Sequence, residues 1–300
     1  MALELRRNAI MELKFHSNLS DYIEYVLSFL LQYEAENNLL IGILNTLKKD
    51  LGAYSKEDTP IFITVEENGA LKLVSIRTPP FNQLISYTDN LDTIDTLVKG
   101  VIDKKMDIPG VLGFKEGALR FSKLWGERQD QEYILETHER IYRLDRVNPE
   151  TLGENIFELA TPDDRDIILT FGKEFIFEAL PEGSKEMAHI ESSQRRLEQA
   201  LKNKMVYVLK VKKKIVSMAK RAHETPNGQT VNAVYTPPEE RRKGYATECV
   251  AKLSQQILSE GKKYCFHFTD LANPTSNKIY QTIGYRPVTD MDLYRFQCRK

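Results

Sequence analysis

The sequence predicts an α/β protein of the α+β kind, built from two consecutive halves. Runs with apolar residues at helical spacing alternate with short runs rich in β-branched and aromatic residues. Asn-Gly pairs at 68–69 and 227–228 adjoin such β-rich runs, and Asn and Gly accept the positive φ angles of tight hairpin turns. The order of elements in the first half recurs in the second. We therefore expect two domains, at residues 1–146 and 147–300.

Helices open the first half. Apolar residues recur every three or four positions between residues 17 and 50, and Asn37-Asn38 interrupts the pattern, which predicts two helices. The other elements predicted here are a hairpin around Asn68-Gly69, a short strand at 83–87, a helix at 91–104, a turn at Pro109-Gly110, a helix around Leu124 and a strand at 139–147. No residue cluster in this half indicates chemistry.

The second half repeats this order. Its predicted elements are a strand starting at Ile156, a helix capped by Thr161 or Asp163, a helix at 187–202, a hairpin across Lys212 to Lys214, a strand after Asn227-Gly228, a helix to about Glu260, a strand at 262–270, a short helix ending at Gly284 and a last strand. The shared order predicts a structural repeat, although the two halves show no evident residue identity.

Composition excludes several classes of function. The chain of 300 residues has 42 Lys plus Arg against 43 Asp plus Glu, so no overall basic field indicates broad nucleic-acid binding. No apolar run approaches the roughly 20 residues of a membrane span, and the N-terminus has no signal-peptide core. We expect a cytoplasmic protein with no nucleic-acid or membrane partner; the oligomeric state is left open.

The cysteines indicate neither disulfides nor a metal site. Cys249, Cys265 and Cys298 show no CxxC or Cys/His spacing typical of metal ligands. Cys265 lies two residues from His267 in a predicted strand, but a buried structural thiol is the favoured interpretation. We therefore expect no metal.

The segment VYTPPEERRKGYATECV, residues 234–250, carries the clearest functional signal. A β-rich run leads through a short loop into a helix, and cations stand where a helix start already has positive partial charge. Helix starts preceded by glycine bind phosphate groups, because their free N–H groups point outward. Gly244 and Ala246 would let a pyrophosphate approach the backbone closely. The alternative is a solvated helix start with basic side chains.

The segment resembles the acetyl-CoA motif of the GNAT superfamily of N-acetyltransferases, [Q/R]-x-x-G-x-[G/A] after a central strand, here Arg241 to Ala246. A second family element, N-x-x-x-N-x-x-Y followed by a Gly-aromatic turn, is matched by Asn273, Asn277 and Tyr280. The resemblance covers about residues 155–298. It implies a mixed, mostly antiparallel central sheet flanked by helices, and the repeated order suggests two tandem GNAT-like halves.

The resemblance also implies roles for individual residues. The pantetheine arm of acetyl-CoA would pair with the backbone of Val234 and Tyr235, with Thr236 close by, and would accept a hydrogen bond from Asn277. Tyr280 would point its hydroxyl at the thioester sulfur as thiolate stabiliser or general acid; the alternative for Tyr280 is a core aromatic residue, a role that suits Tyr285 better. The pyrophosphate would lie on the amides of Arg242, Lys243, Gly244, Tyr245, Ala246 and Thr247, with Arg241 adding charge.

The predicted reaction is acetyl transfer from acetyl-CoA to a primary amine of an unidentified small molecule or peptide. The alternative is a protein that binds acetyl-CoA or CoA without turnover, as a sensor or interaction module. The candidates for the general base are His223, Glu224, His267 and Asp270, and the sequence singles out none of them. In the first half, the segment IPGVLGFKEGALRF occupies the place expected for the phosphate loop but has no arginine pair, so this half resembles a degenerate GNAT-like domain that shapes the acceptor pocket. An unrelated α+β cap is the other interpretation.

Overall fold

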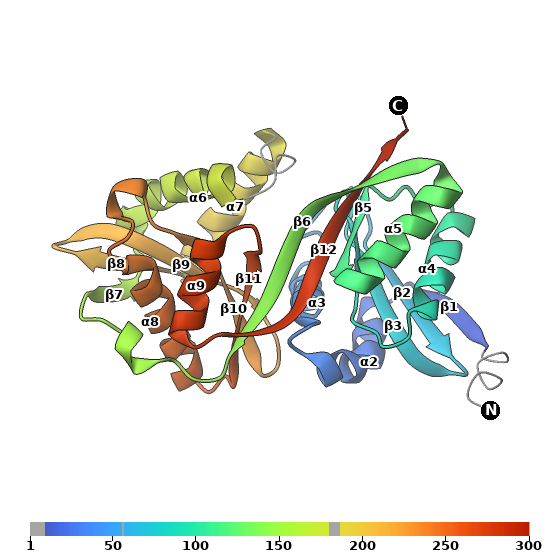
Figure 1. Cartoon of the computed structure of the whole chain (residues 1–300), viewed down its shortest axis with the longest axis horizontal. Coiled ribbons are helices and arrows are strands. Elements are labelled where there is room, and N and C mark those ends of the chain that lie inside the picture. Colours follow the sequence, from blue (N-terminus) through green and yellow to red (C-terminus); the bar gives the residue numbers. More distant parts are fainter. Residues whose placement is uncertain (1–9, 56, 180–186, 300) are drawn as a thin grey trace. The chain divides into compact units, whose positions relative to one another are not determined.

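The structure is a computed structural model that describes residues 10–55, 57–179 and 187–299 (Figure 1). Its contacts divide the chain into two compact units. Unit 1 consists of Met1–Arg140 and Thr289–Lys300, and unit 2 consists of Ile141–Val288. The C-terminal residues thus pack with the N-terminal part of the chain. The domain ranges 1–146 and 147–300 stay a prediction, and the compact units differ from them: Thr289–Lys300 belongs to unit 1, and the second unit begins at Ile141.

The two halves have the same order of elements. The first half consists of β1 (Met11–His16), α2 (Leu19–Leu30), α3 (Asn38–Lys49), β2 (Ile61–Glu67), β3 (Ala70–Arg77), β4 (Gln83–Ile85), α4 (Asp92–Asp103), β5 (Gly110–Phe114), α5 (Lys115–Gln129) and β6 (Gln131–Leu144). The second consists of β7 (Ile156–Leu159), α6 (Arg165–Ala179), α7 (Met187–Lys202), β8 (Val206–Val211), β9 (Lys214–Glu224), β10 (Gly228–Tyr235), α8 (Tyr245–Ser259), β11 (Tyr264–Asp270), α9 (Pro274–Ile283) and β12 (Arg286–Cys298). The predicted repeat is confirmed at the level of element order.

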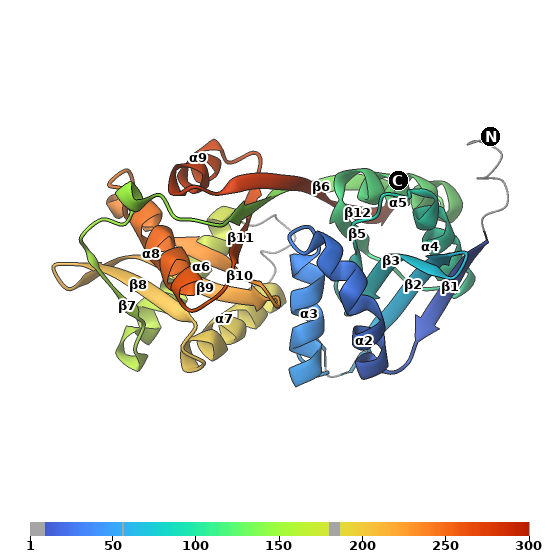
Figure 2. The same cartoon turned by 90° about the horizontal axis from the view of Figure 1, so that it is seen from below.

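Unit 1 is a mostly antiparallel sheet with helices on both faces. Its strand order is β1-β2-β3-β4-β5-β12, followed by β6 up to Arg140. From β1 to β12 the described residues pair antiparallel, except for β4 with β5, which pair in parallel. Asn68 and Gly69 turn the β2–β3 hairpin with φ angles of 52° and 79°, as predicted. Figure 2 shows α2 and α3 on one side of these strands and α4 and α5 on the other. Alternate residues of β2 therefore enter different cores: Ile63 packs with α4, whereas Phe62 contacts Tyr22 of α2.

Unit 2 repeats this arrangement with the strand order β11-β10-β9-β8-β7, in which only β10 and β11 pair in parallel. Alternation along β8 divides its residues between two cores. Tyr207 and Leu209 pack with α8 and α9, while Val206 and Val208 pack with α6 and α7. The confirmed fold class is therefore mixed α/β with a mostly antiparallel sheet flanked by helices.

The last strands of the two halves are exchanged. β12, which ends the second half, pairs with β5 of the first from Met291↔Phe114 to Arg295↔Gly110. β6, which ends the first half, lies next to β11 in the strand order, and its residues from Ile141 on belong to unit 2. Each compact unit is thus completed by residues from the other half of the sequence.

Two elements were not predicted correctly. The first strand, β1, was missed although MELKFH alternates apolar and polar residues, which is typical of a strand with one buried face. The expected turn at Pro109-Gly110 was wrong, since Gly110 begins β5. A Cβ atom on Gly110 would lie 2.2 Å from the backbone oxygen of Tyr294, so this glycine permits close strand pairing.

No helix within the described ranges combines the length and the apolar character that crossing a membrane requires.

Candidate cofactor site

The two parallel strands of unit 2 separate at the predicted site. β10 pairs with β11 from Gly228↔Tyr264 to Thr230↔Phe266, and the described residues show no pairing beyond this point. Ala233, with a φ angle of 48°, marks a bulge where the register of β10 against β9 shifts. Val234, Tyr235 and Thr236 follow the bulge, so their backbone lies where β10 has left its parallel neighbour.

His267 bridges the separating strands. Its Nδ1 atom lies 2.6 Å from the backbone oxygen of Val231, and because a carbonyl only accepts, Nδ1 carries the proton. Burial lowers the pKa of His267 from 6.5 to about 4. The imidazole is therefore neutral at pH 7.

The loop after β10 leaves several amides free. Arg242 and Gly244 have φ angles of 62° and 84°, and α8 begins directly afterwards at Tyr245. In the described part of the chain, no protein acceptor is found for the N–H groups of residues 242–247, which include Ala246 and Thr247. A Cβ atom on Gly244 would meet nothing within 4 Å, so the space above the loop is open. Free amides, open space and a helix start together suit an anion.

The three cations of this loop have different environments. Arg241 donates to the backbone oxygen of Thr236 at 2.9 Å and to Glu178 of α6 at 2.5 Å. Lys243 lies 2.8 Å from Glu240, which also binds Lys214 at 2.7 Å, and these two lysines lower the pKa of Glu240.

Arg242 is exposed and has no carboxylate partner among the described residues. Its side chain is therefore the cation of this loop that is free to meet a ligand, while Arg241 and Lys243 hold the loop in place.

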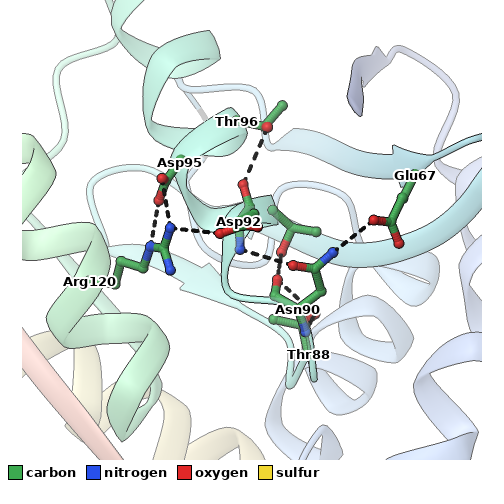
Figure 3. A network of polar contacts seen from close by, with 8 residues as sticks. Glu67, Thr88, Asn90, Asp92, Asp95, Thr96 and Arg120 are labelled. Atoms are coloured by element: carbon green, nitrogen blue, oxygen red, sulfur yellow. Dashed lines mark hydrogen bonds and ion pairs between the residues drawn. The ribbon is translucent and has the colours of Figure 1, made fainter. Parts of the chain in front are cut away.

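The equivalent helix start in unit 1 differs. By element order, the counterpart of the phosphate loop is the segment before α4, not IPGVLGFKEGALRF, which forms β5 and the start of α5; that assignment was wrong. Figure 3 shows Asn90 accepting from the amide of Asp92 at 3.1 Å, and Arg120 of α5 bound to Asp92 and Asp95. Carboxylates occupy this helix start, so it cannot attract an anion as α8 does.

A groove of about 410 Å³ adjoins the start of α8. It is lined by Thr247 of α8 and by Pro274, Thr275, Lys278, Ile279 and Thr282 of α9. The exposed Lys278 has no ion-pair partner in the described ranges. The open amides and the groove therefore form one continuous candidate site within unit 2.

Asn277 is fully engaged inside the protein. Its Oδ1 atom accepts from Tyr142 at 3.0 Å and from Thr269 at 2.6 Å. Its Nδ2 atom donates to the backbone oxygens of Asp270 at 3.0 Å and Asn273 at 2.8 Å. A ligand contact would have to replace one of these bonds. The geometry instead gives Asn277 a positioning role, in which it ties the start of α9 to β11 and β6.

Tyr280 is buried at 4% exposure beside the separating strands. Its ring stacks on His267 with 3.7 Å between centroids. Burial raises the pKa of Tyr280 and a hydrogen bond with Ser276 partly opposes this, so the phenol stays protonated at neutral pH. The hydroxyl of Tyr285, which is also buried, is bound to Ser254 at 2.8 Å.

The remaining base candidates and the cysteine are less suitable. Glu224 pairs with Lys262 at 2.7 Å, and Asp270 accepts from the amide of Ala272 at 2.8 Å. Burial, followed by the charge of Lys220, lowers the pKa of His223 to about 4. Burial raises the pKa of Cys265 to about 12, so its thiol is protonated and not a nucleophile.

Sequence reasoning missed the residues that support the loop. They are Glu178, which holds Arg241; Glu240, which holds Lys243; and Ser217, which donates to the backbone oxygen of Tyr235 at 3.2 Å and accepts from Thr236 at 2.9 Å. Tyr142, the partner of Asn277, was also missed. Glu240 stands three residues before Lys243, a spacing that could have indicated the pair. The other partners are distant in sequence and gave no local signal.

No group of three or more His, Cys, Asp or Glu side chains that could hold a metal ion lies within the described ranges.

Comparisons with known proteins agree with this architecture. Residues 210–293 match the sequence model of a family described as FR47-like protein. A GNAT-family acetyltransferase from Colwellia psychrerythraea is similar to this chain over 96% of it and 100% of its own length, with a TM-score of 0.54 and 12% identity. A GCN5-related N-acetyltransferase from Sphaerobacter thermophilus covers 95% of both chains, with a TM-score of 0.59 and 13% identity.

The chain has the GNAT fold. A Drosophila protein of known structure is also similar, over 95% of this chain and 98% of its own, with a TM-score of 0.65 and 11% identity. No curated protein sequence matches the chain. At these identities the likeness is one of fold, and it covers nearly the whole chain. The GNAT fold therefore describes both units, whereas the FR47-like match lies in the second half, with the candidate site.

Proposed function

We propose that this protein is an acyltransferase that moves an acetyl group from acetyl-CoA directly to a primary amine of a small molecule or peptide. The observation that carries this proposal is the set of unpartnered amides at residues 242–247, which opens onto the groove between α8 and α9 beside the separating strands. The cytoplasmic location expected from the sequence belongs to the same proposal.

The residues present fit the donor molecule. The amides of residues 242–247 and the side chain of Arg242 would hold the pyrophosphate, and Gly244 leaves room for it. The backbone of Val234 and Tyr235, past the last β10–β11 pair, would hold the pantetheine arm. Acetyl-CoA supplies an activated acetyl thioester, and the role of the protein is to orient it and exclude water.

The chemistry requires a neutral amine and a stabilised leaving thiolate. An amine with a pKa of about 10.4 costs about 4 to 5 kcal/mol to deprotonate at pH 7. Tyr280 would donate a hydrogen bond to the departing sulfur. Because a thiol has a pKa of about 8.5 against about 10 for an unburied phenol, Tyr280 would stabilise the thiolate and not transfer its proton fully. The raised pKa of the buried phenol strengthens this preference.

The neutral His267 is the best placed of the four base candidates. It lies between the separating strands, keeps Nε2 unprotonated, and stacks on Tyr280. Because His267 is buried, a proton from the acceptor amine would have to reach it through the site. We therefore assign His267 a positioning or relay role, and the group that takes the proton directly from the amine is left open.

The test is release of CoA thiol from acetyl-CoA with a panel of primary amines. Wild-type protein should release thiol with at least one amine, and Tyr280→Phe should lower kcat by about 10-fold to 100-fold with CoA affinity within about twofold. Tyr285→Phe is the matched control, because it also removes a buried phenol hydroxyl. That hydroxyl is bound to Ser254. It should cost about 1 kcal/mol of stability and leave turnover near wild type.

The same assay separates catalysis from simple binding. If the wild type binds CoA but releases no thiol with any amine, the protein is a CoA-binding module and the enzymatic proposal fails. If thiol release is seen and Tyr280→Phe leaves it unchanged, the enzymatic proposal stands and the role of Tyr280 is wrong.

A further inference from the structure

A second cavity, of about 320 Å³, lies beyond the C-terminus of α9. It is lined by Arg143, Asp145, Arg146, Gly284 and Arg286 and by the chain up to Val288, all of unit 2. A cavity lined by three guanidinium groups and a single carboxylate has an excess of positive charge. Gathering like charges around a cavity is unfavourable unless an anion enters it.

Among the residues that the structure describes, one of these arginines, Arg143, has a charge partner. Arg143 binds Asp145 through two hydrogen bonds, of 2.9 and 3.3 Å, and its guanidinium lies 4.8 Å from the centre of the Tyr264 ring. Arg146 and Arg286 are exposed and form no ion pair or side-chain hydrogen bond within the described part of the chain. Two guanidinium groups are thus available to a ligand.

Capping of α9 does not explain these arginines. Cations often stand at helix C-termini, where they neutralise the last carbonyls. Here Asn148 takes that role: its backbone N–H donates to the oxygen of Ile283 at 2.7 Å, and its side chain donates to that of Thr282 at 3.2 Å. The C-terminal carbonyls of α9 are therefore satisfied without Arg146 or Arg286.

The walls of the cavity are held by close backbone packing. Gly284 has a φ angle of 115°, and a Cβ atom there would lie 2.9 Å from the backbone oxygen of Arg146. The two segments that carry Arg146 and Arg286 are thereby fixed against each other. Two guanidinium groups carried on segments that are fixed against each other suit bidentate binding of a phosphate group.

The cavity is separate from the candidate cofactor site. The two share no lining residue. The groove of the cofactor site is lined by α9 as far as Thr282, whereas the cavity is lined by Gly284 and the residues after it, together with residues 143–146.

We propose that Arg146 and Arg286 form a binding site for a small molecule carrying a dianionic phosphate group, distinct from the pyrophosphate site at the start of α8. Asp145 limits the affinity of this site for phosphate, because it holds the third guanidinium group, that of Arg143. The proposal stands on unit 2 alone and does not require that the protein be an acetyltransferase.

Calorimetric titration with inorganic phosphate, at ionic strength kept constant with sodium chloride, tests the site. Wild-type protein should bind phosphate, and Arg146→Gln and Arg286→Gln should each weaken this binding about tenfold or more. Asp145→Asn should tighten it several-fold by releasing Arg143, a gain that misfolding cannot imitate. Arg242→Gln should leave this binding in place, because that residue belongs to the other anion site.

The outcomes are distinguishable. Weaker binding in Arg146→Gln and Arg286→Gln, with tighter binding in Asp145→Asn, supports the site. Absence of phosphate binding in the wild type overturns it, as does phosphate binding whose affinity and stoichiometry Arg146→Gln and Arg286→Gln leave unchanged. Loss of all phosphate binding in Arg242→Gln alone would assign the anion to the start of α8 and would equally overturn the proposal.

Discussion

At the residue scale, burial sets the protonation states of the polar side chains around the separating strands. His267 and Tyr280 stack on each other within the core of unit 2. Burial lowers the pKa of His267 and raises the pKa of Tyr280, so both side chains stay neutral at pH 7. Asn277 and Arg241 resemble ligand-binding residues in sequence, yet both make their hydrogen bonds inside the protein. Residue type indicated the chemistry of the site, while the neighbours decided which residues remain free.

The buried His267 predicts a loss of stability in acid. Its pKa is about 4 in the folded protein against 6.5 ordinarily, so between these values the unfolded chain binds a proton that the folded protein does not. The stabilisation is therefore complete above pH 6.5 and is lost as pH falls toward 4, by about 3 kcal/mol. Urea unfolding of wild type and His267→Gln at pH 7.5 and 4.5 measures this.

The variant should lose less stability than wild type between the two pH values, because Gln does not titrate. Comparing the differences removes contributions from the other histidines. Equal losses in both proteins would contradict the assigned burial of His267.

At the element scale, the start of α8 differs from that of α4 in a way that matters for ligands. Just before α4, the Asn90 side chain accepts from the amide of Asp92, and the carboxylates of Asp92 and Asp95 bind Arg120 (Figure 3). α8 begins with Gly244 in a left-handed conformation and leaves its amides unpartnered. The same place in two equivalent halves is closed in one and open in the other.

The open helix start predicts the effect of Gly244→Glu. A carboxylate placed there would occupy the anion site and repel the pyrophosphate, so CoA affinity should fall at least 100-fold. Gly261→Glu is a matched control: Gly261 follows α8, has a φ angle of 101°, and likewise has nothing within 4 Å of a Cβ position. The backbone strain is similar in both variants.

Calorimetric titration with CoA should therefore show near-wild-type affinity for Gly261→Glu and a large loss for Gly244→Glu. Retained affinity in Gly244→Glu would show that the pyrophosphate binds elsewhere. A similar loss in both variants would point to strain and not to the anion site.

At the scale of the whole molecule, the exchange of the last strands means that unit 1 needs both ends of the chain. Phe296 of β12 stacks against Trp125 of α5 with 5.6 Å between ring centroids. Arg140 of β6 binds Asp290 of β12 through two hydrogen bonds, of 2.6 and 3.0 Å. A chain cut near residue 146 would lose this strand and expose the edge of β5.

Fragments test this dependence. Residues 1–146 alone should show no cooperative urea unfolding, whereas residues 1–140 joined to 289–300 by a short Asn-Gly turn should unfold cooperatively, because Arg140 and Asp290 are adjacent. The single tryptophan, Trp125, reports on this unit by fluorescence. Adding Phe296→Ala to the joined fragment should destabilise it by about 3 to 5 kcal/mol. Cooperative unfolding of residues 1–146 alone would contradict the role given to β12.

Local patterns predicted much of the fold. The Asn68-Gly69 hairpin, the limits of α7 and the end of α9 at Gly284 were predicted correctly, because turn residues and helical periodicity act over short distances. β5 was missed because its glycines were interpreted as a turn, although they allow close strand packing. The partners of Arg241 and Asn277 could not be predicted, since Glu178 and Tyr142 lie far away in sequence.

The sequence by itself determined the order of most elements, the repeat of that order, and the loop from Arg241 to Thr247 with its resemblance to an acetyl-CoA site. These depend on spacing and on the backbone freedom of a few residues, which are local properties. The tertiary structure alone decided that Arg242 is the free cation of the loop, that Asn277 is engaged, and that the last strands are exchanged. Each of these depends on which distant segments meet, and that is set by packing of the whole chain.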